Sequence, residues 1–447
     1  MFNHKAAKFF IRMAIIVMAI ILFTAPSIIP AGVEYLSKSS WPTADGTFIQ
    51  AFLVKDWSDD KWLSELQYLK DVGMHYVILQ TTADRSNGGK LMTIYPTSLT
   101  GCEMYDGYYD VVDACLRNAK KMGFKVFLGL NFDNGWWKKY AWDPVWLYDR
   151  MEEGNLIADE LYDLYHKKYS STFYGWYWPW EIDNLNFKWS GTQKAVANAI
   201  NINLQHLQTT NRRLPFMISP FMNSRYGSFV EYKNIWTNIL ANTDLGSGDI
   251  LCPQDSVGTG GVSTNAVSDW FSSLRQAVNT RPGLLLWSDA EIFDHENLNS
   301  TTLDRFIMQL KDVQPYVDNI VTFAYSHYYS PNISGYGFHS SYLYYVMNGM
   351  LESTTPESPS NLKKEQLKNG DISLTWNAPK DYSKLCGYLI YRDGKLLERI
   401  QVQRALTGII GQIPSASFID KSKNKSITCK YDVKTYDFSG SISLEVN

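Results

Sequence analysis

The sequence predicts an α/β protein in which a (β/α)8 TIM barrel is followed by a smaller all-β sandwich. Strand and helix patterns alternate eight times over roughly 300 residues, which is the usual size of such a barrel. Beyond a polar, proline-rich stretch at 353–359 the helical patterns stop, and apolar residues recur with a period of two. The chain has 447 residues, which is enough for a barrel and one further module.

The amino terminus, 1–33, is predicted to be a targeting segment outside the fold. Lys5, Lys8 and Arg12 precede an uncharged run at 13–33, which is long enough to cross a bilayer. Its apolar centre also has the length found in signal peptides. Because prolines lie where a cleavage site is expected, we favour an uncleaved membrane anchor over a cleaved signal. In either case the flanking positive charge exports the remainder, as a single-pass membrane protein or a secreted one.

After a polar tether at 34–45, the barrel domain is predicted to cover 46–352. Short β-branched or aromatic runs predict its strands, and apolar residues at helical spacing predict its helices. The predicted strands are 47–54, 75–80, 125–131, 172–181, 215–222, 249–254, 283–287 and beyond, and 319–325. The predicted helices are 59–72, 106–122, 144–169, 193–210, 231–241, 267–279, 301–317 and 340–348. A doubly wound open sheet is the alternative, but it usually has a glycine-rich turn after strand one, and residues 54–57 contain no glycine.

Residues 353–447 form the second predicted domain, a β-sandwich of about 90 residues. Asp393-Gly394 is a hairpin turn signal between alternating apolar runs. This segment resembles a fibronectin type III module, and the resemblance is carried by Pro359-x-x-Leu362, Trp376, Tyr388-x-x-Tyr391-Arg392 and Tyr431-x-Val433. The resemblance implies that Trp376 is a core residue and not a platform for a sugar ring.

Composition narrows the range of functions. The 42 Lys and Arg residues nearly balance 45 Asp and Glu residues, and without a basic patch we expect no nucleic-acid partner. The seven histidines have no metal-ligand spacing, so no catalytic metal or other cofactor is predicted. An odd count of five cysteines argues against a disulfide framework, although Cys386 and Cys429 fall in one domain and could pair. The 15 Trp, 29 Tyr and 21 Phe residues exceed the ordinary share of aromatics. Most should be core, and the rest could stack on sugar rings.

Two glutamates close predicted parallel strands and are the candidate catalytic residues. Glu181 ends strand four, and Glu291 ends strand seven. The active site of a (β/α)8 barrel lies at the carboxyl ends of its strands. Hydrolysis of a glycosidic bond needs one protonated carboxyl group and one carboxylate. Sequence order suggests that Glu181 is the acid/base and that Glu291 is the nucleophile. The alternative is that either glutamate belongs to a salt bridge at the barrel mouth.

Alternation along the strands predicts which side chains accompany the glutamates. If Glu181 points into the barrel, Tyr177 and Gly175 do too, whereas Trp176 and Trp178 face the helices. Trp180 stays ambiguous, because alternation often breaks at a strand end. On strand seven, the face that carries Glu291 also carries Leu285, Trp287 and Asp289.

Other residues near strand ends are candidates for sugar binding. The loop after strand three carries Trp136, Trp137 and Trp142, which form either a sugar-binding wall, the reading we favour, or the lid of a local core. Asp255 is also an alternative catalytic carboxylate, and His327 is expected to be a neutral hydrogen-bonding residue. The predicted substrate-binding residues are Trp180, Trp287, Asp289, Gln254, Asp255, Asn131, Trp136, Trp137, Tyr177, Tyr325 and His327. Further polar candidates are Gln80, Asp133, Asn223 and Arg225.

Three motifs resemble a bacterial barrel family known as domain of unknown function 4434, over about 46–349. They are Gly175-Trp-Tyr-x-Pro-x-Glu181, Pro253-Gln254-Asp255-x-x-Gly258 and Trp287-x-x-x-Glu291-x-Phe293. The family is similar to glycoside hydrolase clan A. The retaining enzymes of clan A carry the acid/base after strand four and the nucleophile after strand seven. The resemblance therefore implies that Glu181 is the acid/base and Glu291 the nucleophile. Clan A usually has Asn before the acid/base, and this chain has Trp180, which implies different contacts to the sugar 2-hydroxyl.

The sequence therefore predicts an extracytoplasmic glycoside hydrolase, retaining by resemblance, that cleaves a polysaccharide or oligosaccharide at or outside the cell surface. The first alternative is a non-catalytic carbohydrate-binding protein on the same scaffold. The second is a surface scaffold for protein contacts. The aromatic loop after strand three favours the first two readings over the third.

Overall fold

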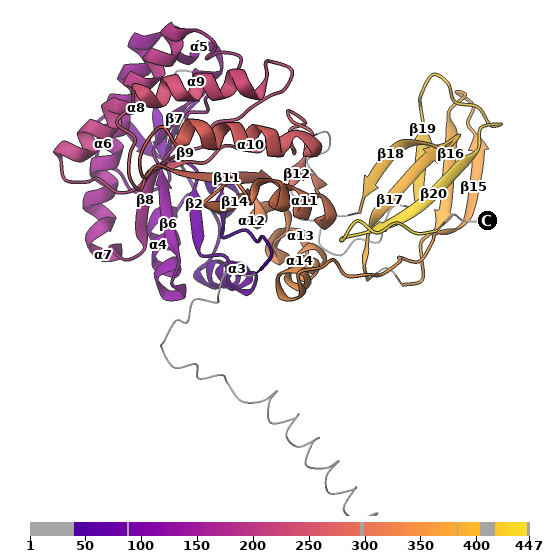
Figure 1. Ribbon diagram of the computed structural model, residues 1–447. Helices are drawn as coiled ribbons and strands as arrows, with labels where there is room; N and C mark the ends of the chain where they lie inside the picture. The colour runs from indigo at the N-terminus through magenta and orange to yellow at the C-terminus, as the bar shows by residue number, and fades with distance from the viewer. Residues whose placement is uncertain (1–39, 87–88, 296–298, 382, 403–415, 445–447) are drawn as a thin grey trace, which may run out of the picture. The chain divides into compact units, whose positions relative to one another are not determined.

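Eight parallel strands close into a barrel that is surrounded by helices (Figure 1). A computed structural model describes residues 40–86, 89–295, 299–381, 383–402 and 416–444. Around the barrel the strand order is β1-β14-β11-β10-β9-β8-β6-β2, so β1 lies between β14 and β2. The barrel strands are β1 (Gly46–Ile49), β2 (Tyr76–Leu79), β6 (Lys125–Gly129), β8 (Phe173–Trp178), β9 (Phe216–Ile218), β10 (Ile250–Leu251), β11 (Leu285–Glu291) and β14 (Asn319–Phe323). The predicted (β/α)8 barrel is confirmed.

The helices follow the strands in the expected order. The long helices are α3 (Asp59–Asp71), α4 (Val111–Met122), α6 (Pro144–Leu161), α8 (Ser190–Thr209), α9 (Phe229–Ala241), α10 (Thr264–Val278), α11 (Leu303–Val313) and α14 (Tyr336–Asn348). Shorter elements are α2 (Ala51–Val54), α5 (Trp136–Lys139), a 3-10 turn at Tyr140–Trp142, a π-helical turn at Tyr162–His166, α7 (Lys167–Tyr169), α12 (Tyr325–Tyr328), α13 (Pro331–Ser334) and the short strands β12 (Phe293–Asp294) and β13 (Asn299–Ser300). Most of these elements end within a few residues of the predicted bounds.

Side chains of the strands divide into two cores, as strand alternation requires. Tyr177 packs inside the barrel with apolar residues of the other strands. Trp176 and Trp178 belong to the core between strands and helices. Gly175 faces the interior, where an added Cβ would lie 2.4 Å from Cε1 of Phe127. The predicted facing of these four residues of strand four is confirmed.

Several predicted elements were wrong in extent. Strands four, five and six end at Trp178, Ile218 and Leu251, short of the predicted ends at 181, 222 and 254, so Glu181 does not close its strand. Strand one ends at Ile49, and the residues up to Val54 form the helical turn α2 instead of more strand. Helix α4 begins at Val111 and not at 106, because the Asp110 carboxylate accepts a hydrogen bond from the backbone N–H of Asp113 and caps the helix (2.8 Å).

A small sheet not predicted from the sequence lies beside the barrel. It has the strand order β5-β4-β3-β7, and its four strands have three residues each. They are β3 (Ala83–Arg85), β4 (Leu91–Thr93), β5 (Cys102–Met104) and β7 (Asn131–Asp133). Strands this short show no measurable alternation, which explains why the pattern analysis missed them.

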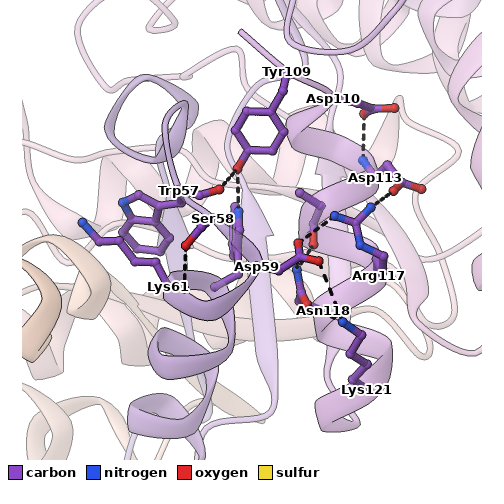
Figure 2. A network of polar contacts seen from close by, with 12 residues as sticks. Trp57, Ser58, Asp59, Lys61, Tyr109, Asp110, Asp113, Arg117, Asn118 and Lys121 are labelled. Atoms are coloured by element: carbon purple, nitrogen blue, oxygen red, sulfur yellow. Dashed lines mark hydrogen bonds and ion pairs between the residues drawn. The ribbon is translucent and has the colours of Figure 1, made fainter.

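A polar network joins the start of α3 to α4, as Figure 2 shows. The Asp59 carboxylate accepts hydrogen bonds from Arg117 (2.7 Å) and Asn118 (2.9 Å). The Tyr109 hydroxyl donates to the backbone carbonyl of Trp57 and accepts from the indole N–H of Trp62 (2.9 Å). These contacts fix the segment between β1 and α3, which carries part of the cavity described below.

The residues after 353 form two antiparallel three-stranded sheets, β15-β16-β19 and β18-β17-β20. Trp376 is buried there and packs edge-to-face on Tyr388, with ring centroids 5.1 Å apart. Asp393 and Gly394 both have positive φ in the turn between β17 and β18. The strands are β15 (Ser360–Gln366), β16 (Ile372–Asn377), β17 (Leu385–Arg392), β18 (Lys395–Gln401), β19 (Ser417–Asp420) and β20 (Tyr431–Asp437). The predicted fibronectin type III-like sandwich, with Trp376 in its core, is confirmed.

Two further predictions concern cysteines and the membrane. Cys386 and Cys429 are free thiols, as are the three other cysteines, so the pairing considered from the sequence does not occur. The predicted anchor or signal at 1–33 lies outside the described residues, as does the first half of the tether. Within the described part of the chain, none of the helices combines the length and the apolar character that a membrane span requires.

Candidate active site

A cavity of about 530 Å³ opens at the carboxyl ends of several barrel strands. Such a volume lies within the usual range of ligand sites, about 300–1,000 Å³. Glu181 lines the cavity, and the exposed aromatic rings of Phe52 and Trp137 are 57% and 44% accessible. The remaining lining residues are Gln50, Ala51, Gln80, Thr81, Asp84, Ile94, Tyr105, Tyr108, Phe132, Asn134 and Pro179. One predicted catalytic glutamate is thus placed in an aromatic-lined cavity.

Glu181 lies three residues beyond the end of β8. Its backbone carbonyl accepts a hydrogen bond from the indole N–H of Trp136 (3.0 Å), and its carboxyl group is hydrogen-bonded to the Gln254 side chain. Burial of the carboxyl group raises the pKa of Glu181 to about 7; the nearby Asp183 adds to this rise and the Gln254 hydrogen bond opposes it. A glutamate with such a pKa can give or take a proton near neutral pH.

Glu291 is the last residue of β11, and its side chain is only 1% exposed. Its Oε2 accepts hydrogen bonds from the backbone N–H (2.7 Å) and the hydroxyl (3.1 Å) of Thr259. Burial, and next the charge of Asp255, raise the pKa of Glu291 to about 8, although the Thr259 hydrogen bonds lower it. Gly258 approaches so closely that an added Cβ would lie 2.7 Å from Cβ of Glu291.

Asp289 lies two residues before Glu291 on the interior face of β11 and is also buried. Its Oδ2 is 3.5 Å from the Ser219 hydroxyl, and its Oδ1 has no hydrogen-bond partner among the described residues. Burial raises the pKa of Asp289 well above its ordinary value, and the charges of Glu291, Asp255 and Glu181 raise it further. Asp289 is therefore the carboxyl group within electrostatic range of both candidate catalytic glutamates.

The carboxylate of Asp255, the alternative catalytic residue, is held by hydrogen bonds to neighbouring segments of the fold. Its Oδ2 accepts from the Gln309 amide of α11 (2.6 Å), and its Oδ1 accepts from the backbone N–H groups of Val257 (3.1 Å) and Glu291 (3.2 Å). Burial raises the pKa of Asp255 to about 6. These bonds attach the loop after β10 to the end of β11, and Asp255 is not among the residues that line the cavity.

Several aromatic residues predicted to bind sugar are buried instead. Trp180 is 1% exposed and packs on Trp136, with ring centroids 5.6 Å apart; Trp136 is itself fully buried. The segment after β7 therefore agrees with both interpretations of the aromatic loop. Trp137 lines the cavity, as a sugar-binding wall would, whereas Trp136 closes a local core. Tyr177 is part of the barrel interior, and Tyr325 packs among aromatic rings of α12 and α14.

Trp287 faces the barrel interior as predicted, but at the wrong depth for a substrate. It pairs with Asn319, the first residue of β14, and its ring contacts Tyr76, the first residue of β2 (5.0 Å). Trp287 therefore lies near the amino ends of the strands, away from the barrel mouth. It fills the barrel core and cannot reach a ligand in the cavity.

Some of the polar candidates lie at the cavity or contact Glu181, and others stabilise the fold. Gln80 lines the cavity, and Gln254 bonds to Glu181. The amide of Asn131 is buried and donates to the Arg150 carbonyl (2.8 Å). It therefore links β7 of the small sheet to helix α6. Nε2 of His327 accepts from the backbone N–H of Gln50 (2.9 Å).

His327 is also fully buried, and burial lowers its pKa to about 3. It is therefore neutral, and it orients the segment that lines the cavity. The other polar candidates lie apart from the cavity lining: Asp133 pairs with two arginines, Asn223 bonds to Asn184, and Arg225 is exposed.

Part of the cavity comes from residues that the sequence analysis missed. Asp84 of β3 accepts a hydrogen bond from the Tyr105 hydroxyl (2.7 Å), and both line the cavity with Tyr108 and Phe52. Asp84 belongs to the unpredicted small sheet, Tyr105 and Tyr108 to the segment after β5, and Phe52 to the turn after β1. The cluster of tyrosines at 105–109 was the only available signal in the sequence.

Comparisons with known proteins give the family and the fold. A protein from Bacteroides thetaiotaomicron described as a proposed alpha-L-fucosidase is 22% identical, with a TM-score of 0.56 over 72% of this chain and 99% of that one. An endo-beta-1,4-mannanase from Thermotoga petrophila is 10% identical over 91% of this chain and 97% of that one, with a TM-score of 0.44. An alpha-amylase of Niallia circulans is 33% identical over 92 residues, which are 21% of this chain and only 6% of the amylase.

The barrel is thus similar in fold to the Bacteroides thetaiotaomicron protein. The family model described as Domain of unknown function (DUF4434) matches residues 44–335, which is more than half of the chain and nearly the whole barrel. The chain belongs to this family.

Proposed function

We propose that this protein is a glycoside hydrolase whose acid/base is Glu181. The observation that carries this proposal is a glutamate at the carboxyl end of β8, in an aromatic-lined cavity of about 530 Å³ and with a pKa raised to about 7. A protonated carboxyl group can protonate the leaving glycosidic oxygen, and the resulting carboxylate can then activate water. Exposed rings such as Trp137 can pack on the apolar faces of sugars.

Glu291 is proposed as the second carboxylate, which attacks the anomeric carbon. This role requires the ionised form. The two hydrogen bonds from Thr259 favour ionisation, whereas burial and Asp255 oppose it. The raised pKa of Asp289 keeps that carboxyl group protonated, so it adds no negative charge beside Glu291.

The cavity favours an uncharged sugar as substrate. Its lining includes the carboxyl groups of Asp84 and Glu181 and, among the described residues, no Lys or Arg side chain. An anionic sugar would lack a cationic partner there and would face two acidic groups. Amide and hydroxyl groups of Gln50, Gln80 and Thr81 can instead bind neutral hydroxyls.

A non-catalytic carbohydrate-binding protein is the second candidate. The observation that favours it is the enclosure of Glu291, which is 1% exposed and bonded to Thr259 instead of facing the cavity. Such a protein would bind glycans in the same cavity without turnover. Glu291→Gln would then leave glycan affinity unchanged, and the wild-type chain would release no sugar.

A hydrolysis panel tests the proposal and separates the two candidates. The wild-type chain, Glu181→Gln and Glu291→Gln are incubated with neutral polysaccharides and aryl glycosides, and released reducing ends are measured beside binding by calorimetry. Release by the wild type alone supports the hydrolase. Binding by all three without release overturns it in favour of the binding protein.

We further propose that the barrel acts outside the cytoplasm, attached to a membrane or secreted. The support is the sequence of the first 33 residues, with Lys5, Lys8 and Arg12 before an uncharged run. Protease added to intact cells should then degrade the barrel domain. Full protection of the barrel in intact cells, with cleavage only after lysis, would contradict this location.

A further inference from the structure

A second cavity lies beside the first and is not used by the proposed chemistry. Its volume is about 310 Å³. It is lined by the loop after β8, the loop after β9 and the first turns of α8 and α9, with Asn184, Lys188, Gln193, Tyr226 and Asn234 among its residues. Because these loops follow barrel strands, the cavity opens on the same face of the barrel as Glu181.

One loop connects the two cavities. Glu181 lines the first, and Asn184 and Lys188, three and seven residues further along the same loop, line the second. Asp183 holds this loop in a turn, because its carboxylate accepts from the backbone N–H groups of Leu185 and Asn186 (2.6 Å each). The loop that joins the linings of the two cavities is therefore short in sequence, and its turn is fixed by hydrogen bonds.

Tyr140 packs between the lining of the first cavity and the loop that carries the second. Its ring centroid lies 6.3 Å from that of Trp137, which lines the first cavity, and 6.4 Å from that of Phe187, the residue before Lys188. The Tyr140 backbone φ of 45° is in the left-handed region, which residues other than glycine rarely adopt. Residues held in such strained conformations cluster at functional sites. Its ring packs on Trp136 and against Trp137, which lines the first cavity.

The hydroxyl of Tyr140 is close to groups of both cavities. Burial raises the pKa of Tyr140, and the charges of Asp183 and Glu181 and the hydroxyl of Tyr226 raise it further, while a hydrogen bond with Asn186 lowers it. Glu181 belongs to the first cavity and Tyr226 to the second. Because the ring of Tyr140 also contacts Trp137 of the first cavity and Phe187 beside Lys188 of the second, a chain that fills both cavities would pass Tyr140.

The second cavity also contains polar groups that are free to bind. The ammonium group of Lys188, the hydroxyl of Tyr226 and the amide of Asn234 have no hydrogen-bond partner among the described residues. Lys188 does interact electrostatically with the carboxylate of Glu231, which lines the same cavity. By contrast, Asn184 is occupied by the backbone of Asn223 and Gln193 by the Phe187 carbonyl. Three free donors of different geometry beside a tyrosine ring suit the hydroxyl groups of a sugar.

We propose that the two cavities form one extended glycan site on both sides of Glu181, and that the substrate is a polysaccharide chain cleaved internally. The inference rests on the proposed function and adds its substrate class. A chain that fills both cavities places sugar units on either side of the bond next to Glu181. Tyr140 contacts the chain at the junction, and Lys188, Tyr226 and Asn234 bind its distal units.

Calorimetry with the full-length Glu181→Gln chain tests the extended site without requiring hydrolysis. The probes are neutral β-linked gluco-, manno- and xylo-oligosaccharides from disaccharide to hexasaccharide. For the series that binds, affinity is expected to rise with chain length until both cavities are filled. Adding Tyr226→Ala should lower hexasaccharide affinity about three- to tenfold and disaccharide affinity less. Lys311→Ala, an exposed lysine on α11, is the matched control for a further variant, Lys188→Ala.

Affinity that stops rising after the disaccharide, or a Tyr226→Ala loss equal at every length, would overturn the extended site. Failure of the proposed function is separate. It would appear as length-dependent binding combined with no hydrolysis by the wild-type chain. If the wild type cleaves the hexasaccharide, internal cuts agree with the inference, and release of single terminal sugars only would contradict it.

Discussion

The ends of β8 and β11 each carry a glutamate, but the two are held in different ways. Glu181 lies on a loop, lines an open cavity and shares one side-chain hydrogen bond with Gln254. Glu291 is the last residue of its strand, is closed off from solvent and receives two hydrogen bonds from Thr259. One carboxyl group is placed for contact with a ligand and solvent, and the other is placed for fixed geometry.

This difference corresponds to the two tasks in glycoside hydrolysis. An acid/base must exchange protons with a leaving group and with water, so it needs access. A nucleophile must meet one carbon atom at one angle, so it needs rigid support. The backbone carbonyl of Glu291 adds to that support, because it accepts hydrogen bonds from Arg305 and Gln309 (3.0 Å each).

The largest effect is expected from Glu291→Gln, which removes the proposed nucleophile but keeps its shape. Turnover should fall below detection on every glycoside, while Thr259 can still donate to the amide oxygen. Thermal unfolding should show a melting temperature close to that of the wild type. Turnover within tenfold of the wild type would show that the enclosed glutamate is structural.

The pH dependence of kcat/KM should reflect both environments. The proposed mechanism requires Glu181 protonated and Glu291 ionised, and their pKa values are raised to about 7 and about 8. Activity should therefore fall as pH rises above the Glu181 value and also as pH falls below the Glu291 value. A bell-shaped profile with its maximum between about pH 7 and 8 is expected. A maximum near pH 5 would mean that both carboxyl groups titrate as ordinary surface glutamates.

Gly258→Ala tests the rigid support of Glu291. The new Cβ would lie 2.7 Å from Cβ of Glu291 and 2.7 Å from the Phe293 carbonyl, so Glu291 must move. Crowding of this kind costs about 1–3 kcal/mol of stability, and kcat should fall with little change in glycan affinity. Gly191→Ala, with no atom within 4 Å of the added Cβ, is the control. Equal kcat in the two variants would contradict the need for fixed geometry.

The smallest effect is expected from Trp137→Ala, in the lining of the open cavity beside Glu181. Loss of one exposed aromatic contact should weaken glycan binding by about 0.5–1.5 kcal/mol and raise KM more than it lowers kcat. Trp142→Ala is matched to it, because Trp142 is similarly exposed but absent from the cavity lining. Calorimetry of both variants should therefore separate them, and equal affinity would remove Trp137 from the site.

Alternation allowed the sequence to predict much of the barrel. The inward facing of Tyr177 and the outward facing of Trp176 depend only on the period of two in a strand, and both predictions are confirmed. Height along the barrel axis has no such local signal. Trp287 and Glu291 share a face, yet Trp287 lies four positions before Glu291, about 13 Å along the strand, so only Glu291 is at the mouth.

The site itself depends on long-range packing that the sequence does not display. Trp180 and Trp136 are buried because aromatic side chains from separate segments of the chain, including Trp146 of α6, meet around them. Asp84 reaches the cavity through a three-residue strand, and Thr259 reaches Glu291 from the loop after β10. Such contacts depend on where distant loops meet, which pattern analysis cannot give.

The most direct test of the account compares Glu181→Ala on two aryl glycosides of the same sugar. One has a dinitrophenyl leaving group, which departs without protonation, and the other has a methylumbelliferyl group, which needs an acid more. If Glu181 is the acid, kcat/KM should fall about 10²–10⁴-fold on the second substrate and far less on the first. An equal loss on both substrates, or no loss on either, would contradict the assignment of Glu181 as the proton donor.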